Sequence, residues 1–280
     1  MSRQTSICVL GAGAVGSLLG AAFADKGHAV TFADHGSRLA ELRRNGLRVV
    51  GLDGQVTKVR NGNFVESDGL RGPFDIVLLA VKAHQINALA PALSRLLDPG
   101  TSLLTLQNGI PWWYFQGCEG EYSGTTLRSL DPDGAIAAAV HPEHIIGTVV
   151  YPAAEVLEDG TVRHVEGDRF VLGDIRGNTG DRVEELATLI NEAGFRGQVQ
   201  SDIRAEIWLK SWGSLAFNTV GALTRSTMAG ICREPETRSL ARDLMLETEA
   251  VANAVGIEMR VPLERRLAGA EAVGEHKTSM

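Results

Sequence analysis

A glycine-rich run near the start constrains the fold more than any other stretch. The apolar residues 7–10 lead directly into glycines at 11, 13 and 16, and residues 17–26 then have the composition of a helix. In such a strand–turn–helix unit, Gly11 permits the tight turn, Gly13 lets the backbone approach a pyrophosphate, and Gly16 lets the helix pack close to the strand. The pyrophosphate would lie on the helix N-terminus, where free N–H groups and the helix dipole favour negative charge. The run therefore predicts a dinucleotide-binding loop made of Gly11, Ala12, Gly13, Ala14, Val15 and Gly16.

Composition and charge narrow the class of protein. The chain has 280 residues, a net charge of −7 and 44% hydrophobic residues, which is typical of a globular protein that binds neither nucleic acid nor an anionic membrane. No apolar run is long enough to cross a bilayer, and the N-terminus enters a strand without space for a signal peptide. Cys8, Cys118 and Cys232 stand far apart, which predicts free thiols, a cytoplasmic location and no metal site.

Alternating elements dominate the first part of the chain. Apolar strand patterns at 5–10, 29–33, 75–81 and 102–107 alternate with helical patterns at 37–45 and 85–97, and 55–59 is a further short strand. Gly46 follows the helix at 37–45 in the manner of a C-terminal cap. Strands that alternate with helices predict an α/β domain with a doubly wound parallel sheet.

The pattern changes after about residue 145. Residues 145–151, 161–164 and 169–172 have the pattern of a small β meander, followed by a helix at 181–193. From Asp202 onward the sequence is helical, with helices expected at 203–220, 236–255 and 262–273. We therefore predict two domains, at 1–200 and 201–280, of which the second is all-helical. Three helices are few for a complete domain, so we expect the chain to be truncated at its C-terminus relative to its natural relatives.

Polar residues follow two of the predicted strands. Lys82 comes directly after the strand at 75–81, and Asn108 comes after the strand at 102–107. In open α/β sheets ligands bind at the carboxyl ends of the strands, so both side chains are placed to meet a cofactor. The alternatives are a solvated loop lysine and an ordinary Asn-Gly turn.

A polar stripe crosses an otherwise apolar helix in the second domain. Lys210, Ser214 and Asn218 are four residues apart and share one face, while Trp208 and Trp212 flank the lysine. The stripe faces either water or a cleft, and the tryptophans favour the cleft. A lysine in a partly dry cleft can have its pKa lowered toward neutrality and then donate a proton.

With these residues assembled, the chain resembles the ketopantoate reductase (2-dehydropantoate 2-reductase) family over essentially its whole length. The blocks that carry the resemblance, in order, are GAGAVGSLLG, LLAVKAHQ, LQNGIPWW, KSWGSLAFN, LTRSTM and the terminal HKTSM. The resemblance implies a Rossmann-type domain, a helical domain, an active site in the cleft between them, and reduction of ketopantoate to pantoate by NADPH. It implies Lys210 as the general acid, substrate binding by Asn108, Ser214 and Asn218, and Ser279 as the serine that binds the substrate carboxylate. Asn108 also matches a cofactor contact, and Lys82 and Gln85 match the cofactor-contacting pair.

Three departures from the family pattern qualify these expectations. Ser214 stands where the family usually has asparagine, and the family's segment beyond HKTSM, with an active-site glutamate, is absent. At the end of the second strand, His35 replaces an arginine that pairs with the NADPH 2′-phosphate. Asp34 occupies the place of a carboxylate that binds the NAD ribose, while Arg38 could reach a phosphate from the next helix. The family predicts NADP(H), with NAD(H) as the competitor.

Two alternative functions stay open beside ketopantoate reduction, and the oligomeric state has a general expectation. The aromatic cluster at 112–114 could shape a pocket for another small 2-oxo acid, or could simply pack in the core. Ser214 and the missing segment would also suit a protein that binds NAD(P) without turnover. Dimers are the commonest arrangement of soluble enzymes, which makes a homodimer the prior expectation.

Overall fold

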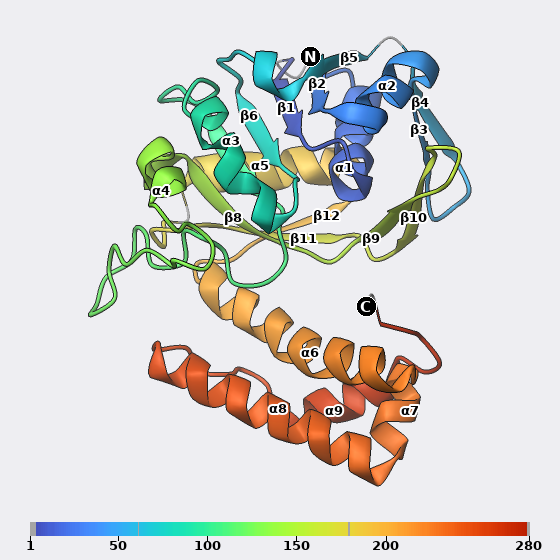
Figure 1. Cartoon of the computed structure of the whole chain (residues 1–280), viewed down its shortest axis with the longest axis vertical. Coiled ribbons are helices and arrows are strands. Elements are labelled where there is room, and N and C mark those ends of the chain that lie inside the picture. The colour runs from blue at the N-terminus through green and yellow to red at the C-terminus, as the bar shows by residue number, and fades with distance from the viewer. Residues whose placement is uncertain (1–3, 61, 179, 279–280) are drawn as a thin grey trace. The chain divides into compact units, whose positions relative to one another are not determined.

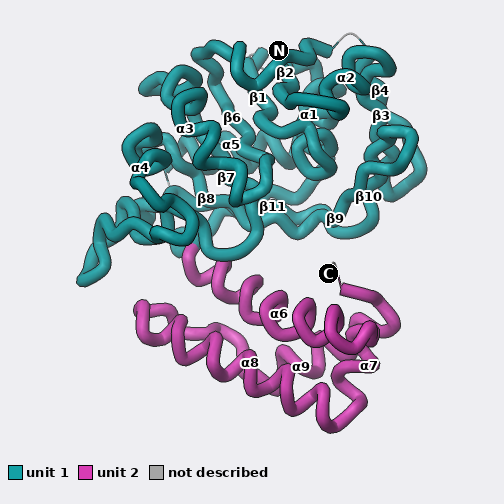
Figure 2. Tube along the Cα trace, in the orientation of Figure 1, with its two compact units in different colours: residues 1–203 teal, residues 204–280 magenta. Residues whose placement is uncertain are grey.

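The chain forms two compact units, residues 1–203 and 204–280 (Figure 1, Figure 2). The computed structural model describes residues 4–60, 62–178 and 180–278. The first unit is α/β and the second is helical, and each buries its own hydrophobic cluster.

In the described part of the first unit, eight strands form one sheet in the order β12-β11-β8-β7-β6-β1-β2-β5. Neighbouring strands run parallel except β8 and β11, so the doubly wound parallel sheet predicted from the sequence is confirmed with one antiparallel pair. The chain builds outward from β1 to β2 and β5 and then returns to β6 on the other side of β1. The strands are β1 Ser6–Leu10, β2 Ala29–Asp34, β5 Asn63–Glu66, β6 Ile76–Leu79, β7 Ser102–Thr105, β8 Ile145–Val150, β11 Arg169–Asp174 and β12 Arg196–Val199.

A second, four-stranded sheet in the described residues corrects the prediction of a meander. It has the order β4-β3-β10-β9 and consists of β3 Leu47–Val50, β4 Val56–Val59, β9 Ala153–Val156 and β10 Val162–Glu166. Of the three expected meander strands, β8 and β11 pair in the main sheet, whereas β10 pairs with β3. The prediction of a single β meander was therefore wrong. β8 is buried throughout, as suits a sheet covered on both faces, while β10 begins with alternating buried and exposed residues, as suits a sheet with one face in water.

Helix α1 contacts strands of both sheets, which explains why it is apolar and rich in small residues (Figure 1). A Cβ at Gly20 would lie 2.7 Å from the Val9 side chain and 2.6 Å from the Phe32 ring, so only glycine allows this approach. Gly46 ends α2 with a φ of 72°, as the C-cap prediction requires. The helices of this unit are α1 Ala14–Asp25, α2 Gly36–Asn45, α3 Ile86–Leu93, α4 Ala135–Ala139 and α5 Asp181–Glu192, with 3-10 turns η1 Ser67–Gly69, η2 Ala83–Gln85 and η3 Pro142–His144.

The second unit contains the helices α6 Ile203–Thr224, α7 Met228–Arg233, α8 Pro235–Ala254 and α9 Leu263–Ala272. Trp212 of α6 lies in its core and donates from Nε1 to the Met245 carbonyl at 2.7 Å. The sequence analysis did not predict α7, because a segment of six residues is too short to show helical periodicity. The sequence signal for the start of this helix is the N-cap Thr227, whose hydroxyl accepts from the Gly230 N–H. Among the described helices, none has the length and apolar character needed to span a membrane.

Candidate active site

The glycine loop has the geometry that its sequence predicts. Gly11 adopts a φ of +102°, and a Cβ there would lie 2.7 Å from the Val81 backbone nitrogen. A Cβ at Gly16 would lie 2.3 Å from the Gly11 carbonyl oxygen, so α1 packs against the loop only with glycine there. Gly13 differs, because a Cβ there would meet nothing within 4 Å and no side chain caps the helix that it begins. The loop therefore leaves open space and uncapped helical N–H groups at the place where an anion binds.

A pocket of about 570 Å³ opens beside this loop. It lies at the carboxyl ends of β1, β2, β5 and β6, where the strand order reverses, which is the position of ligand sites in doubly wound sheets. Its lining includes six of the residues predicted from the sequence, Gly11, Gly13, Asp34, His35, Lys82 and Gln85. The remaining lining residues were not predicted, and they are Glu66, Ser67, Asp68, Ala80, Val81, His84, Ala88 and Leu89.

Hydrogen bonds set the backbone around Lys82 and Asn108. Gln85 accepts from the Lys82 backbone N–H through Oε1 at 2.9 Å, which closes the turn after β6. Gln107 donates from Nε2 to the Leu79 and Val81 carbonyls at 2.8 Å each, tying the end of β7 to the end of β6. These bonds place Lys82 and Gln85 on the pocket wall and Asn108 at the adjacent strand end.

Asp34 holds the glycine loop, and Arg38 is turned away from the pocket. The Asp34 carboxylate accepts from the Ala12 N–H at 2.7 Å and from the His35 N–H at 2.8 Å. Arg38 donates to the Ala12 carbonyl at 2.9 Å and to the Gly160 carbonyl at 3.0 Å, and it does not line the pocket. The loop is thus fixed by one side chain from the end of β2 and one from α2.

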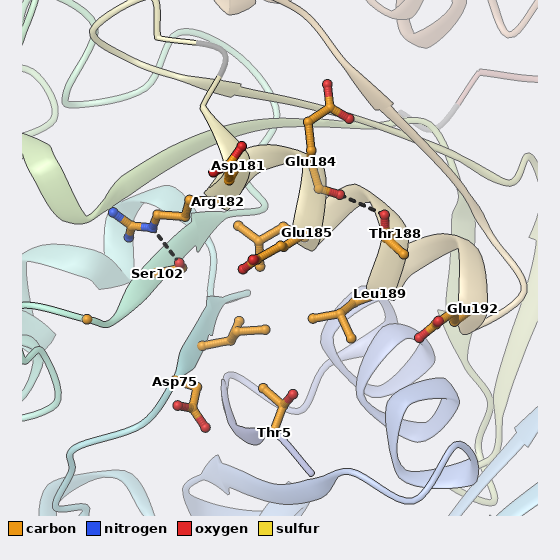
Figure 3. Close-up of a pocket in the computed structure, with 13 residues that line it drawn as sticks. Thr5, Asp75, Ser102, Asp181, Arg182, Glu184, Glu185, Thr188, Leu189 and Glu192 are labelled. Carbon is orange, nitrogen blue, oxygen red and sulfur yellow. Dashed lines mark hydrogen bonds between the residues drawn. The ribbon is translucent and has the colours of Figure 1, made fainter. Parts of the chain in front are cut away.

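A larger pocket, about 770 Å³, lies at the amino ends of β1, β6 and β7 (Figure 3). Two of its polar side chains, those of Arg182 and Asp75, are engaged within the protein. Arg182 donates to the Ser102 hydroxyl at 2.7 Å and to the Thr101 carbonyl at 2.6 Å, and burial lowers the pKa of its guanidinium. Asp75 accepts from both the N–H and the hydroxyl of Ser6 at 2.7 Å. The Arg182 contact joins β7 to α5, and the Asp75 contacts join β1 to the residue before β6. The pocket lies at the edge of the sheet opposite to that used for ligands.

The polar stripe of the second unit lies on α6. Lys210, Ser214 and Asn218 are each partly buried, whereas Trp208 and Trp212 are buried. Ser279, the third predicted substrate residue of this unit, lies outside the described residues. The helix therefore carries polar side chains on a face that is neither core nor fully exposed.

The aromatic cluster at 112–114 belongs to the core. Trp112, Trp113 and Tyr114 are each at most 3% exposed, and Trp113 donates from Nε1 to the Thr105 hydroxyl at 3.0 Å. Core packing, rather than a pocket wall, accounts for these three side chains. Within the described residues, no group of three or more His, Cys, Asp or Glu side chains could hold a metal ion.

A glycine loop at the switch point of a parallel sheet places the first unit in the class of dinucleotide-binding α/β folds. The family model "Ketopantoate reductase PanE/ApbA" matches residues 7–177, and "Ketopantoate reductase PanE/ApbA C terminal" matches 202–280. A 2-dehydropantoate 2-reductase from Mesorhizobium japonicum is 43% identical over 98% of this chain and 84% of its own length.

Two solved structures share the whole fold. A protein from Ralstonia solanacearum MolK2, solved as a candidate ketopantoate reductase, has a TM-score of 0.92 and 33% identity, covering 99% of this chain and 86% of its own. A 2-dehydropantoate 2-reductase from Geobacter metallireducens has a TM-score of 0.80 and 28% identity, and the match covers 98% of this chain and 85% of that protein's chain. The chain belongs to the ketopantoate reductase family PanE/ApbA.

Proposed function

We propose that this chain reduces ketopantoate to pantoate with hydride from a reduced pyridine nucleotide. The observation that carries the proposal is Lys210, a partly buried lysine on the polar stripe of α6, in a chain 43% identical to a 2-dehydropantoate 2-reductase. Reduction of a ketone requires a hydride at carbon and a proton at oxygen. Lys210 would donate that proton to the keto oxygen, with Ser214 and Asn218 as hydrogen-bond partners of the substrate.

The first unit fits the cofactor. Gly13 leaves open space, the N-terminus of α1 is uncapped, and Asp34 stands at the end of β2, where a carboxylate binds the ribose hydroxyls. When bound, the nicotinamide supplies the hydride. Lys82 and Gln85 would contact the cofactor from the pocket wall, and Asn108 would contact both cofactor and substrate. Ser279, which lies outside the described residues, stays a predicted substrate contact.

The test is steady-state reduction of ketopantoate by Lys210→Ala. We expect kcat to fall by about 10²–10⁴-fold, the usual contribution of a general acid, with cofactor affinity unchanged. Lys58→Ala is the matched control, because Lys58 is an exposed lysine on β4 that does not line the pocket beside the glycine loop. Unchanged turnover in Lys210→Ala would rule out this mechanism.

Within this function, we propose that the cofactor is NAD(H) rather than the NADP(H) implied by the family. Asp34 and Glu66 are register partners on β2 and β5, and Asp68 follows on the same rim of the pocket. Arg38, the cation that could pair with a 2′-phosphate, instead bonds the loop and the Gly160 carbonyl. Carboxylates repel a 2′-phosphate and accept hydrogen bonds from a 2′-hydroxyl.

Ser214 favours a second candidate, a reductase of another small 2-oxo acid, because a hydroxyl reaches less far than the asparagine usual in the family. A panel of 2-oxo acids with NADH and NADPH distinguishes the two. Binding of the dinucleotide without oxidation in every assay would instead indicate a protein that binds NAD(P) without turnover. The homodimer stays a prediction, which light scattering measures.

A further inference from the structure

The side chain of Arg38 joins three separate parts of the first unit. Its Nε donates to the Ala12 carbonyl of the glycine loop at 2.9 Å, and its Nη1 donates to the Gly160 carbonyl at 3.0 Å. The same Nη1 forms an ion pair of 3.0 Å with Glu41, one turn further along α2. The Arg38 side chain is only 15% exposed, so water competes weakly for these bonds. The guanidinium therefore connects α2, the glycine loop and the turn between β9 and β10.

Glu41 and Gly160 fit against each other around this guanidinium. Gly160 adopts a φ of +78°, and a Cβ at its position would overlap the Glu41 carboxylate. Only a residue without a Cβ leaves room for the carboxylate beside the turn. Glu41 and Gly160 thus hold Nη1 together, and we refer to these two residues as the Arg38 latch.

The latch directs Arg38 away from a pocket that it stands beside. His35 lines the pocket at the glycine loop, and Arg38 follows it by three residues, so their Cβ positions on α2 are about 5–6 Å apart. Asp34 and Arg38 also bond to the N–H and to the carbonyl of the same residue, Ala12. Arg38 nevertheless lines a separate, smaller pocket of about 330 Å³ on α2, together with Glu41.

We propose that Glu41 and Gly160 are positioning residues that set the cofactor preference by holding Arg38 away from a 2′-phosphate. With the latch closed, the carboxylates on the pocket rim meet the ribose without a compensating cation. Once released, the guanidinium turns to the pocket, where its planar fork binds a phosphate through two parallel hydrogen bonds. This inference rests on the proposed binding of a pyridine nucleotide with preference for NAD(H). It makes the choice of cofactor depend on a turn outside the pocket.

The test is a double-mutant cycle between Glu41→Gln and Arg38→Gln, with calorimetric titration of the full chain by NAD⁺ and by NADP⁺. The oxidised cofactors alone undergo no turnover, so the affinities do not depend on the substrate. In Glu41→Gln the NADP⁺/NAD⁺ affinity ratio should rise about 10-fold, because bonds to the 2′-phosphate replace bonds to the latch. Arg38→Gln loosens the glycine loop for both cofactors alike, so its ratio should stay at the wild-type value. In the double variant the gain should vanish.

Two further variants separate the latch from a general loss of charge. Glu155→Gln is the matched control, because Glu155 forms an ion pair with Arg163 of the same β9–β10 hairpin, and its ratio should equal that of wild type. Gly160→Ala keeps every charge but displaces the Glu41 carboxylate, so it should raise the ratio as Glu41→Gln does. Thermal unfolding shows which variants are folded.

Each outcome has a distinct meaning. A gain that persists in the double variant overturns the proposal, because the lost charge of Glu41 would then act on the phosphate without Arg38. A ratio that shifts toward NAD⁺ in Arg38→Gln alone also overturns it, since Arg38 would already bind the 2′-phosphate in wild type. A wild type that favours NADP⁺ with a ratio unaltered in Arg38→Gln overturns the NAD(H) preference alone. An Arg38-dependent gain in a chain that reduces no ketopantoate supports the latch and overturns only the reductase function.

Discussion

Replacing Asp34 with asparagine tests the preference for NADH directly. The substitution keeps the size of the side chain and removes its charge. The carboxylate now accepts from the Ala12 and His35 N–H groups, and an amide has only one oxygen for these two donors. We therefore expect the free energy of unfolding to fall by about 1–2 kcal/mol in the apo protein, because one N–H loses its partner.

The effect on cofactor choice follows from the charges on the pocket rim. Two unit charges 4 Å apart interact by about 4 kcal/mol near a protein surface and by about 1 kcal/mol in water. The rim is open to solvent, so we take roughly 2 kcal/mol for the repulsion between Asp34 and a 2′-phosphate, or about 30-fold in a rate ratio. Glu66 and Asp68 stay in the variant, so part of the repulsion remains.

The assay is kcat/KM for NADH and for NADPH at saturating 2-oxo acid, at low and high salt. Wild type should prefer NADH, and Asp34→Asn should lower the NADH/NADPH ratio about 30-fold, with a smaller effect at high salt. Asp53→Asn is the control, since Asp53 also accepts from a backbone N–H, that of Gln55, in an exposed turn. A wild type that prefers NADPH tenfold, or a ratio unaltered in Asp34→Asn, would refute the reasoning.

Two further predictions concern the loop and the core. Gly16→Ala should destabilise the fold by about 1–3 kcal/mol in chemical denaturation, because its Cβ would meet the Gly11 carbonyl, whereas Gly13→Ala should keep the fold and weaken dinucleotide binding. Equal stabilities of the two variants would contradict the distinct roles. Burial raises the pKa of the Cys8 thiol to about 12, so at pH 8 this thiol should resist a disulfide reagent that modifies Cys118. Between pH 9 and 12 the Cys8 thiol ionises in the unfolded chain before it ionises in the native protein, so the free energy of unfolding should fall as the pH rises. Fast labelling of Cys8 by the disulfide reagent in the native protein would contradict its burial.

The dinucleotide loop could be predicted because its requirements are local. Gly11 needs a positive φ and Gly16 needs the absence of a Cβ, and both demands are visible in a strand–turn–helix of about ten residues. The strands β1, β2, β6 and β7 and the helices α1, α2, α3 and α5 followed from the same kind of local pattern, whereas β3, β5, β9, β12 and α4 were not predicted. Lys82 and Gln85 line the pocket because parallel strands end at one edge of a sheet, and their contact with a cofactor stays a prediction.

Strand pairing could not be predicted in the same way, because it joins residues distant in the sequence. Val162 pairs with Val49 in the small sheet, while Val171 pairs with Val149 in the main sheet, and the three short strands gave no local signal for this division. Glu66 and Asp68 were missed for the same reason, since they enter the pocket only because β5 lies beside β2.

The sequence by itself determined the class of fold, the position of the dinucleotide loop and the polar stripe of α6, because glycine sterics and helical spacing act over a few residues. The tertiary structure decided the electrostatics around these features. It bonds Arg38 to Gly160 from the distant β9–β10 turn, and it sets Arg266 of α9 on Gly213 of α6. Partner choice between separate elements depends on how they pack. The cofactor preference proposed here therefore comes from tertiary contacts that the linear motifs do not encode.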